Sequence, residues 1–289
     1  MSAPAYIQNF LTVQLSGRCA RNPAHKTGKI MTASILCERH DSVATVTINR
    51  PERRNAMDRS SWQSLADIFD DLSRDTGLRC VIVTGAGGKA FGSGNDISEF
   101  ETLRTNAGEV RAYNDITLKA VHAIENSLHP TVARIEGFCL GGGLEIALAC
   151  DIRIASPGAT FSLPVKNMGI YLDPALVETL VNAVGRATAL ELVLEGRRLA
   201  TDEALARGII TRIAPEGGLD QEIAEAVDRI CEGAPLAARF NRRAIRKVGL
   251  SGPSSDAEFN DAASYGDTED YHNAWRSFLA KKKVEFKGR

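Results

Sequence analysis

Two glycine-rich segments carry the clearest chemical signal in the sequence. One runs from Gly85 to Gly94 and the other from Gly137 to Gly143, and each follows a short apolar run. Glycine lets the backbone approach a ligand closely, and the second segment opens a helical pattern whose first amides have no partner within the helix. Two converging backbone N–H groups can hold the negative charge that develops on a thioester oxygen. Together the segments predict an oxyanion pocket, although each one alone is more simply a tight turn.

The spacing of the glycines excludes two common phosphate-binding motifs. No Gly-Lys-Ser/Thr follows either segment, so neither is a P-loop. Gly85-Ala-Gly87 has the start of a dinucleotide fingerprint, but the distance to Gly92 and Gly94 is wrong for one. The chain is nearly neutral, with a net charge of −1. This balance argues against nucleic acid as a partner, so an anionic ligand depends on local cations or backbone amides.

Strand and helix patterns alternate from Ser42 to about Ala214, which predicts an α/β fold around these segments. Val43–Ile48 is a strand pattern, and Arg79–Thr84 is an apolar strand that enters the first glycine-rich segment. Asp58 is expected to cap the helix between them. Apolar residues three and four apart predict that one face of this helix is buried, namely Trp62, Leu65, Phe69 and Leu72.

The remainder of the chain is mainly helical. Helical patterns run from Leu219 to Ile230 and from Leu236 to Val248, and Thr201 is expected to cap an earlier helix. We divide the chain into a disordered or weakly ordered leader, an α/β core and a C-terminal helical segment, with the boundaries 1–33, 34–214 and 215–289.

The leader and the cysteines bear on the compartment. The first 37 residues contain no Asp or Glu, which is compatible with a mitochondrial transit peptide, a disordered tail or an upstream start codon. The six cysteines show no C-x-x-C pair, which favours free thiols in a reducing compartment over disulfides or a metal site. No apolar run approaches the roughly 18 residues that span a membrane. We expect a cytoplasmic protein, or a mitochondrial matrix protein if the leader is a transit peptide.

Five segments in order resemble the crotonase (enoyl-CoA hydratase/isomerase) superfamily over roughly Ser34 to Arg289. These segments are Asn49–Met57, Val81–Gly85, Phe91–Ile97, Gly137–Asp151 and Trp275–Lys283. The resemblance implies a crotonase-like spiral of ββα turns with a C-terminal helical segment that forms a homotrimer, or a hexamer made of two trimers. It also implies an acyl-CoA thioester substrate, no metal, and no separate cofactor because coenzyme A is part of the substrate.

The resemblance assigns the two oxyanion amides. One belongs to Asn95, directly after Gly94, and the other to Gly142, directly after Gly141. Asn95 departs from the alanine that is more usual at this position and is similar to some enoyl-CoA isomerases. Its backbone amide would work as that of alanine does, and its side chain could line the acyl pocket.

The resemblance also implies contacts to coenzyme A. The stretch from Asn95 to Ser98 is expected near the adenine, and Arg53 near the phosphates. Near the C-terminus, two positions match those where some relatives cover the nucleotide, although Lys281-Lys-Lys283 alone is more simply a solvated charge run. The residues expected to bind substrate are Arg53, Gly94, Asp96, Ile97, Ser98, Gly141, Phe278 and Lys281.

The acid–base residues differ from those of the usual hydratase. Hydration of a 2-enoyl thioester needs a group that deprotonates water and a group that protonates C2. Two glutamates do this in hydratases of the family, and the first corresponds to Glu145. The second position holds Val165, which cannot move a proton. Asp173, eight residues on, is either a substitute carboxylate or only the N-cap of a helix that begins at Pro174.

Three functions remain open. The leading hypothesis is an enoyl-CoA hydratase/isomerase with Glu145, and in part Asp173, as catalytic residues. The first alternative is an acyl-CoA decarboxylase or thioester hydrolase on the same scaffold, and the second is a non-catalytic binding protein. A basic helical face near the C-terminus is interpreted as solvated or as a subunit contact, and comprises Arg239, Arg242, Arg243, Arg246 and Lys247.

Overall fold

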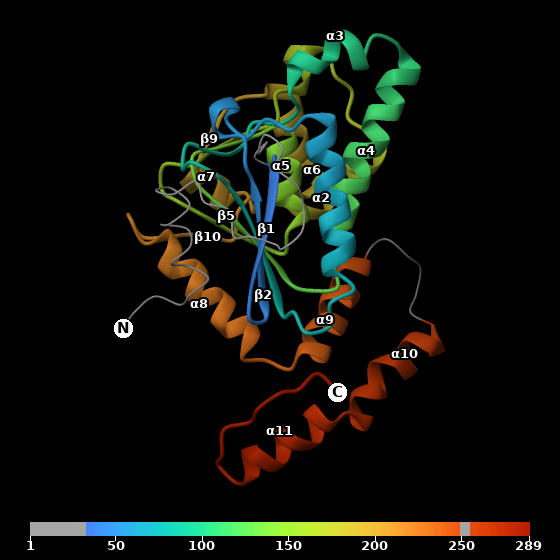
Figure 1. The fold of residues 1–289 in the computed structure, drawn as a ribbon, viewed down its shortest axis with the longest axis vertical. Coiled ribbons are helices and arrows are strands. Elements are labelled where there is room, and N and C mark those ends of the chain that lie inside the picture. Colours follow the sequence, from blue (N-terminus) through green and yellow to red (C-terminus); the bar gives the residue numbers. More distant parts are fainter. Residues whose placement is uncertain (1–32, 249–254) are drawn as a thin grey trace, which may run out of the picture.

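The strands in the part of the chain that the structure describes form two β-sheets (Figure 1). The computed structural model describes residues 33–248 and 255–289, so the leader predicted at 1–33 lies almost wholly outside the described residues. The larger sheet has the order β1 (Ile35–His40), β2 (Val43–Ile48), β3 (Cys80–Gly85), β5 (Thr131–Ile135), β7 (Ile152–Ala155) and β10 (Arg212–Ile213). The smaller sheet has the order β4 (Ala90–Gly92), β6 (Phe138–Leu140), β8 (Thr160–Ser162) and β9 (Leu199–Ala200).

Successive strand pairs build both sheets at once. In the pairs β3–β4, β5–β6 and β7–β8, the first strand joins the larger sheet and the second joins the smaller one, with parallel neighbours in each. A helical stretch follows each pair, which gives the predicted succession of ββα turns. The helices up to β10 are α2 (Arg59–Leu72), α3 (Phe100–Leu103), α4 (Ala107–Glu125), α5 (Gly142–Ala149), α6 (Pro174–Glu195) and α7 (Thr201–Ala206).

Strand β3 is buried on both faces of the larger sheet, which explains its uninterrupted apolar sequence. Val81 and Val83 belong to the main core beneath α2, α4 and α5. Cys80 and Ile82 belong to a second cluster formed with α8 (Leu219–Cys231). Parallel strands covered on both sides read as continuous apolar runs and not as alternating ones.

One predicted helix cap is confirmed and one is wrong. Asp58 caps α2, and its Oδ1 accepts a hydrogen bond from the backbone N–H of Ser61 at 2.7 Å. Thr201 is the first residue of α7 and not its cap. Its hydroxyl lies 2.7 Å from the carbonyl oxygen of Pro157 and 2.9 Å from that of Ala159. The hydroxyl thus bonds to a distant loop.

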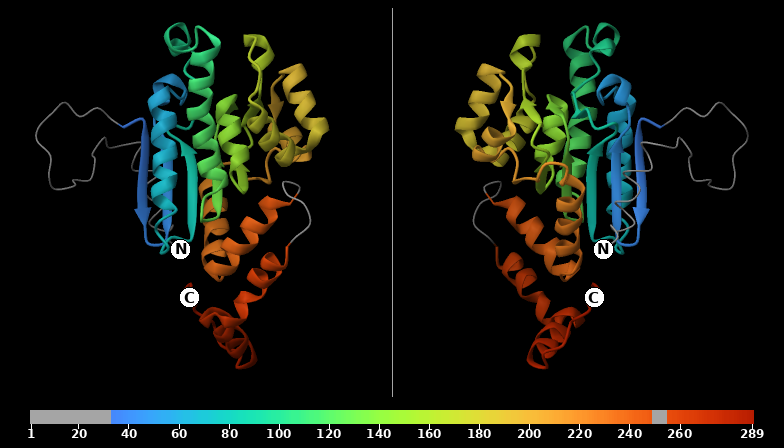
Figure 2. Two further views of the ribbon diagram at one scale, coloured as in Figure 1. Left: turned by 90° about the vertical axis from the view of Figure 1, so that its right-hand side faces the viewer. Right: turned by 90° about the vertical axis from the view of Figure 1, so that its left-hand side faces the viewer.

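Three α-helices follow α8 in the described part of the chain, and the last two of them extend away from the sheets (Figure 2). They are α9 (Pro235–Lys247), α10 (Asp256–Ala263) and α11 (Glu269–Leu279). Figure 1 places α10 and α11 at the end of the molecule opposite α3. Large apolar side chains on these two helices are exposed, among them Phe259, Phe278 and Leu279. Among the residues that the structure describes, no helix is long and apolar enough to cross a membrane.

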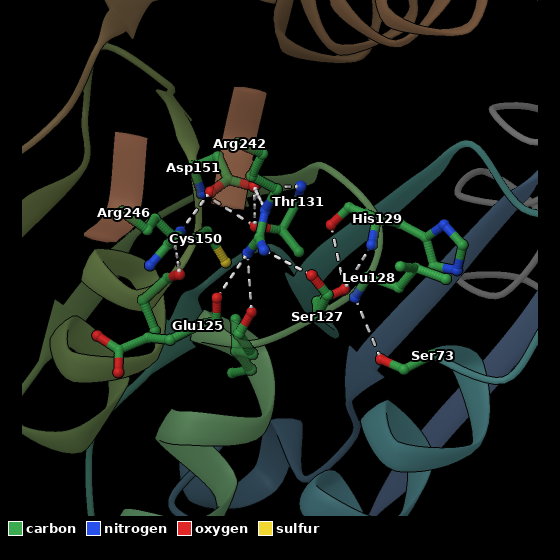
Figure 3. Close-up of polar contacts among 12 residues, drawn as sticks. Ser73, Glu125, Ser127, Leu128, His129, Thr131, Cys150, Asp151, Arg242 and Arg246 are labelled. Atoms are coloured by element: carbon green, nitrogen blue, oxygen red, sulfur yellow. Dashed lines mark hydrogen bonds and ion pairs between the residues drawn. The ribbon is translucent and has the colours of Figure 1, made fainter. Parts of the chain in front are cut away.

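The basic face of α9 is solvated only in part: Arg243 and Lys247 are exposed as the sequence interpretation expected, whereas the other three arginines are not. Arg242 and Arg246 both bind the carboxylate of Asp151, which follows α5, with N–O distances of 2.6 and 2.8 Å (Figure 3). Arg239 donates to the carbonyl oxygens of Thr76 and Leu78. These arginines dock α9 onto the core of the same chain.

Candidate active site

The two glycine-rich turns meet at the N-terminus of α5. A Cβ atom added to Gly94 would lie 3.0 Å from the amide nitrogen of Gly142. A Cβ atom on Gly143 would lie 2.3 Å from the carbonyl oxygen of Gly92, which no side chain tolerates. The backbones of the two turns are therefore packed directly against each other, and this contact requires glycine.

Hydrogen bonds on either side of Asn95 hold its peptide in place. The N–H of Met57 donates to the carbonyl oxygen of Gly94, and the N–H of Asp96 donates to that of Met57, both at 2.8 Å. On the other turn, the N–H of Gly141 donates to the carbonyl oxygen of Ser162 at 2.9 Å. The amides of Asn95 and Gly142 themselves have no acceptor among the described residues. The two expected oxyanion donors are thus fixed in position and unused.

Glu145 lies in the first turn of α5, next to these amides. It lines a narrow pocket together with Thr179 and six leucines, so its surroundings are almost wholly apolar. Burial raises the pKa of its carboxyl to about 7, and the positive charge of Arg104 opposes this shift. A carboxyl group with a pKa near neutrality can both take up and release a proton under physiological conditions.

Arg104 is a residue of this site that the sequence analysis did not identify. Its guanidinium lies 4.5 Å from the ring centre of Phe100 and 5.3 Å from that of Tyr113, and it donates to the side-chain oxygen of Asn114. Within the described part of the chain it forms no ion pair. Arg104 lies between α3 and α4, and a lone arginine in such a connection has no distinguishing local sequence signal.

Two residues, Val165 and Asp173, bear on the second carboxylate of the usual hydratase. Val165 is half-buried and packs against the main core, so no acidic side chain stands there. Asp173 is the N-cap of α6, with its Oδ1 accepting from the N–H of Ala175 at 3.0 Å. Its neighbours Leu172 and Leu176 line the pocket of Glu145. The capping role is established, and a catalytic role for Asp173 stays a prediction.

Comparison with known proteins decides the family. The family model described as enoyl-CoA hydratase/isomerase matches residues 38–289. A short-chain-enoyl-CoA hydratase of Clostridium acetobutylicum is 33% identical over 260 residues, which cover 89% of this chain and 98% of that protein. The crystal structure of an enoyl-CoA hydratase/carnithine racemase from Magnetospirillum magneticum has a TM-score of 0.87 and 37% identity, and the match covers 90% of this chain and 97% of that one.

The chain belongs to the enoyl-CoA hydratase/isomerase family. A crotonyl-CoA hydratase of Syntrophomonas wolfei is 29% identical over 256 residues, covering 88% of this chain and 97% of that protein. The family resemblance and the α/β fold of repeated ββα turns inferred from the sequence are thereby confirmed. The family is enzymatic, so the chain is an enzyme by membership.

The loop expected to bind coenzyme A, from Asn95 to Ser98, contains both a buried residue and exposed residues. Asp96 is buried and turned inward, where it accepts from Arg50 at 2.9 Å and from the hydroxyl of Ser98 at 2.7 Å. Ile97 and Ser98 are exposed beside Arg53, whose guanidinium lies 3.7 Å from Asp96. Asp96 therefore shapes the loop, while Arg53, Ile97 and Ser98 are exposed and their contact with coenzyme A stays a prediction.

Phe278 and Lys281 are not brought to the oxyanion turn within one chain. Phe278 lies in the last turn of α11 with 82% of its surface exposed, and Lys281 follows the helix. Figure 1 shows α11 at the far end of the molecule from α3, whereas α5 lies among the upper elements. Their expected contact with coenzyme A stays a prediction.

Two buried side chains that support the glycine turns were not assigned this role from the sequence. The amide nitrogen of Asn55 donates to the carbonyl oxygens of Ala86 and Ala90 at 3.0 and 2.6 Å. Trp62 is fully buried, and its indole N–H donates to Oδ1 of Asn95 at 2.8 Å. Asn55 lies in the segment Asn49–Met57 that resembles the family, and Trp62 lies on a helix face predicted to be buried. Neither pattern indicates the hydrogen-bond partners of these side chains.

Proposed function

We propose that the protein is an enoyl-CoA hydratase/isomerase that acts on an acyl-CoA thioester. The observation that carries this proposal is the pair of unused amides, Asn95 and Gly142, beside a carboxyl group whose pKa is raised to about 7. The names of the relatives from Clostridium acetobutylicum and Syntrophomonas wolfei support the same substrate class.

In the proposed mechanism, the thioester oxygen binds between the N–H groups of Asn95 and Gly142. For hydration, the carboxylate of Glu145 takes a proton from water while the water oxygen bonds to C3. The C2–C3 π electrons move toward the carbonyl, and the two amides stabilise the resulting enolate oxygen. A protonated carboxyl group, either Glu145 itself or Asp173 after proton exchange with it, then delivers a proton to C2. Double-bond migration uses the same enolate, with proton exchange between C4 and C2.

Asp173 is the proposed second proton carrier. One of its oxygens caps α6, and the other has no partner among the described residues. The position of its neighbours in the wall of the pocket supports this assignment. Asp173→Asn keeps the cap and removes the acid. Equal rates of hydration in this variant and in wild type would reduce Asp173 to a helix cap.

Three substrates offered side by side test the proposed function. We expect purified protein to convert crotonyl-CoA, a 3-enoyl-CoA, or both, and Glu145→Gln to lose this turnover while still binding coenzyme A thioesters. Full turnover of every accepted substrate by Glu145→Gln would contradict the role of Glu145.

The third substrate, a malonyl-type CoA, tests the alternative reactions. Val165 favours this alternative, because decarboxylation or thioester hydrolysis needs the oxyanion pocket but not the paired glutamates. Release of CO2 or free coenzyme A without any change to the enoyl substrates would support it. Tight binding of all three thioesters without turnover would support a non-catalytic binding protein.

We further propose that the chain assembles as a homotrimer, or as a hexamer of two trimers. The exposed apolar residues of α10 and α11, including Phe259 and Phe278, support contacts between copies, which would also bring Phe278 and Lys281 to a neighbouring site. Light scattering of the purified protein should give three or six times the mass of one chain. A monomer with full activity would contradict both assignments.

A reducing compartment, namely the cytoplasm, is proposed as the location. The five cysteines in the described residues are free, and Cys80, Cys139 and Cys150 are buried. Burial raises the pKa of the Cys150 thiol to about 12, which keeps it protonated and unreactive. The absence of a separate cofactor remains a prediction.

A further inference from the structure

The side chain of Asn95 offers a hydrogen-bond donor beside the oxyanion amides. Its Oδ1 accepts the indole N–H of Trp62 at 2.8 Å. An indole N–H only donates, so the atom that faces it must be the oxygen and not the nitrogen of the amide. The orientation of this amide is therefore set by the chemistry of its partner, and Nδ2 points away from Trp62.

The Nδ2 group of Asn95 is unused in the described part of the chain. It has no hydrogen-bond acceptor there, and it is not among the fully buried polar atoms that lack a partner. Asn95 as a whole is half-buried. An amide with one end held by a buried tryptophan and the other end accessible and unpaired is arranged to donate to something outside the chain.

The surroundings leave Asn95 little freedom to turn. Trp62 is 0% exposed, and its ring packs so closely on the second turn that a Cβ on Gly142 would lie 2.8 Å from its Cζ2. The peptide of Asn95 is bracketed by the two hydrogen bonds to Met57. One tryptophan thus touches both turns that carry the oxyanion amides, and it fixes the side chain of one of them.

Covalent geometry limits where the bound group can lie. Nδ2 is separated from the backbone nitrogen of the same residue by four bonds, so the two atoms lie within about 5 Å of each other. An acceptor bound by Nδ2 therefore lies within about 8 Å of the backbone nitrogen expected to bind the thioester oxygen, a range that includes oxygens on C3 and C4 of the acyl group. The donor has no fixed charge, so it suits a hydroxyl or carbonyl oxygen.

We propose that Asn95 is a specificity-determining residue whose side-chain amide, oriented by Trp62, donates to an oxygen on C3 or C4 of the acyl group. The substrate class is then an acyl-CoA with an oxygen on C3 or C4, in preference to a plain alkenyl one. This inference rests on the proposed function for the placement of the thioester. Trp62 is a positioning residue, because it acts through Asn95.

The binding of three acyl-CoA ligands to a variant that cannot turn them over tests the proposal. Dissociation constants are measured by calorimetry for butyryl-CoA and its 3-hydroxy and 4-hydroxy derivatives, in Glu145→Gln protein so that none is turned over. One neutral hydrogen bond corresponds to about a two- to tenfold preference, and we expect at least one hydroxylated ligand to bind more tightly by this factor. Asn95→Ala, added to Glu145→Gln, should abolish the preference.

Trp62→Phe separates positioning from packing. It removes the indole donor and keeps an aromatic ring, so the amide of Asn95 is free to rotate and the preference should fall without a matching loss of affinity for butyryl-CoA. Gln63→Ala, the next residue of α2, is the matched control and should leave the preference intact. A preference lost in Asn95→Ala but unchanged in Trp62→Phe would overturn the role of Trp62.

Different measurements would overturn this inference and the proposed function. Equal binding of all three ligands, or a preference that survives Asn95→Ala, overturns the inference even if wild type hydrates crotonyl-CoA. Absence of turnover in wild type overturns the proposed function, while the binding ratios still decide the role of Asn95. If Trp62→Phe does not fold, Asn95→Ala alone carries the test.

Discussion

An acidic residue lies near each end of α5, and the pKa values of the two carboxyl groups are shifted in opposite directions. Glu145, in the first turn, lies in an apolar pocket, and burial raises its pKa to about 7. Asp151 follows the helix only six positions later and is also largely buried. Burial alone would raise its pKa, but the charges of Arg242 and Arg246 outweigh this effect and hold the pKa below its ordinary range.

The difference lies in the partners and not in the depth of burial. Asp151 accepts hydrogen bonds from both arginines, and from the N–H and hydroxyl of Thr131 at 2.8 and 2.9 Å (Figure 3). The side chain of Glu145 has no hydrogen-bond partner among the described residues, and the charge of Arg104 lowers its pKa by less than burial raises it. Satisfied carboxylates stabilise a fold, whereas an unsatisfied one near neutrality is available for proton transfer.

The largest expected effect is on catalysis at Glu145. Glu145→Gln should lower kcat on crotonyl-CoA by about 10²–10⁴-fold, since a general acid–base group contributes this much. The unfolding free energy should stay the same or rise, because a poorly solvated acid is removed. A steady-state assay and urea unfolding measure the two quantities. If Glu145→Gln were less stable than wild type and equally active, Glu145 would serve stability and not proton transfer.

The next effect is on stability at Asp151. Asp151→Ala leaves Arg242 and Arg246 without their carboxylate, and breaking a buried pair in this way costs about 3–5 kcal/mol of unfolding free energy. Denaturant unfolding at a fixed protein concentration measures the loss. The control is Asp115→Ala, which breaks an exposed pair with Arg111 and should cost about 0.5 kcal/mol or less. Equal losses in the two variants would contradict an anchoring role for Asp151.

The pH dependence of stability should have opposite signs at the two acids. The folded pKa of Glu145 is above its ordinary value of 4.5, so its contribution to the unfolding free energy falls as pH rises from about 4.5 to about 7. The folded pKa of Asp151 is depressed, so its contribution is present above its ordinary value of 3.8 and is lost as pH falls through the folded pKa.

Unfolding curves of wild type, Glu145→Gln and Asp151→Asn across pH 3–8 separate these contributions. Relative to Glu145→Gln, wild type should lose stability between about pH 4.5 and 7. Relative to Asp151→Asn, wild type should gain stability as pH rises through the acid range. Parallel curves for all three proteins would contradict both assignments.

The smallest effect concerns Arg104. Its charge lowers the pKa of Glu145, so Arg104→Met should raise that pKa further and move the acid limb of kcat/KM to higher pH. The pH–rate profile is the measurement, and the shift should be smaller than the one that burial produces. Arg111→Met, on the exposed face of α4, is the control and should leave the profile in place.

Local signals made part of this arrangement predictable from the sequence. The cap of α2 by Asp58, the apolar strand β3 and the two glycine turns each depend on residues within a few positions of one another. Glu145 was identified because it lies two residues after the glycine triplet in a segment that resembles the family. In each case the signal that identified the residue or element lies within one short stretch of sequence.

Contacts across the chain were not predictable in the same way. Trp62 and Asn95 are 33 positions apart, and Asp151 and Arg242 are 91 apart, so no local pattern joins either pair. Thr201 was misassigned because carbonyl oxygens 42 and 44 positions earlier compete for its hydroxyl. The arginines of α9 looked like a solvated face because their carboxylate lies on another element.

The glycine triplet has a consequence for how this gene can change over time. Gly141 has φ of 52° and ψ of −128°, a backbone conformation open only to glycine. Gly143 is blocked by the backbone of Gly92, and Gly142 by the ring of Trp62. Only the last obstacle is a side chain. A substitution at position 142 therefore becomes tolerable only after Trp62 has been replaced by a smaller residue, so mutations at these two positions are epistatic and their order matters.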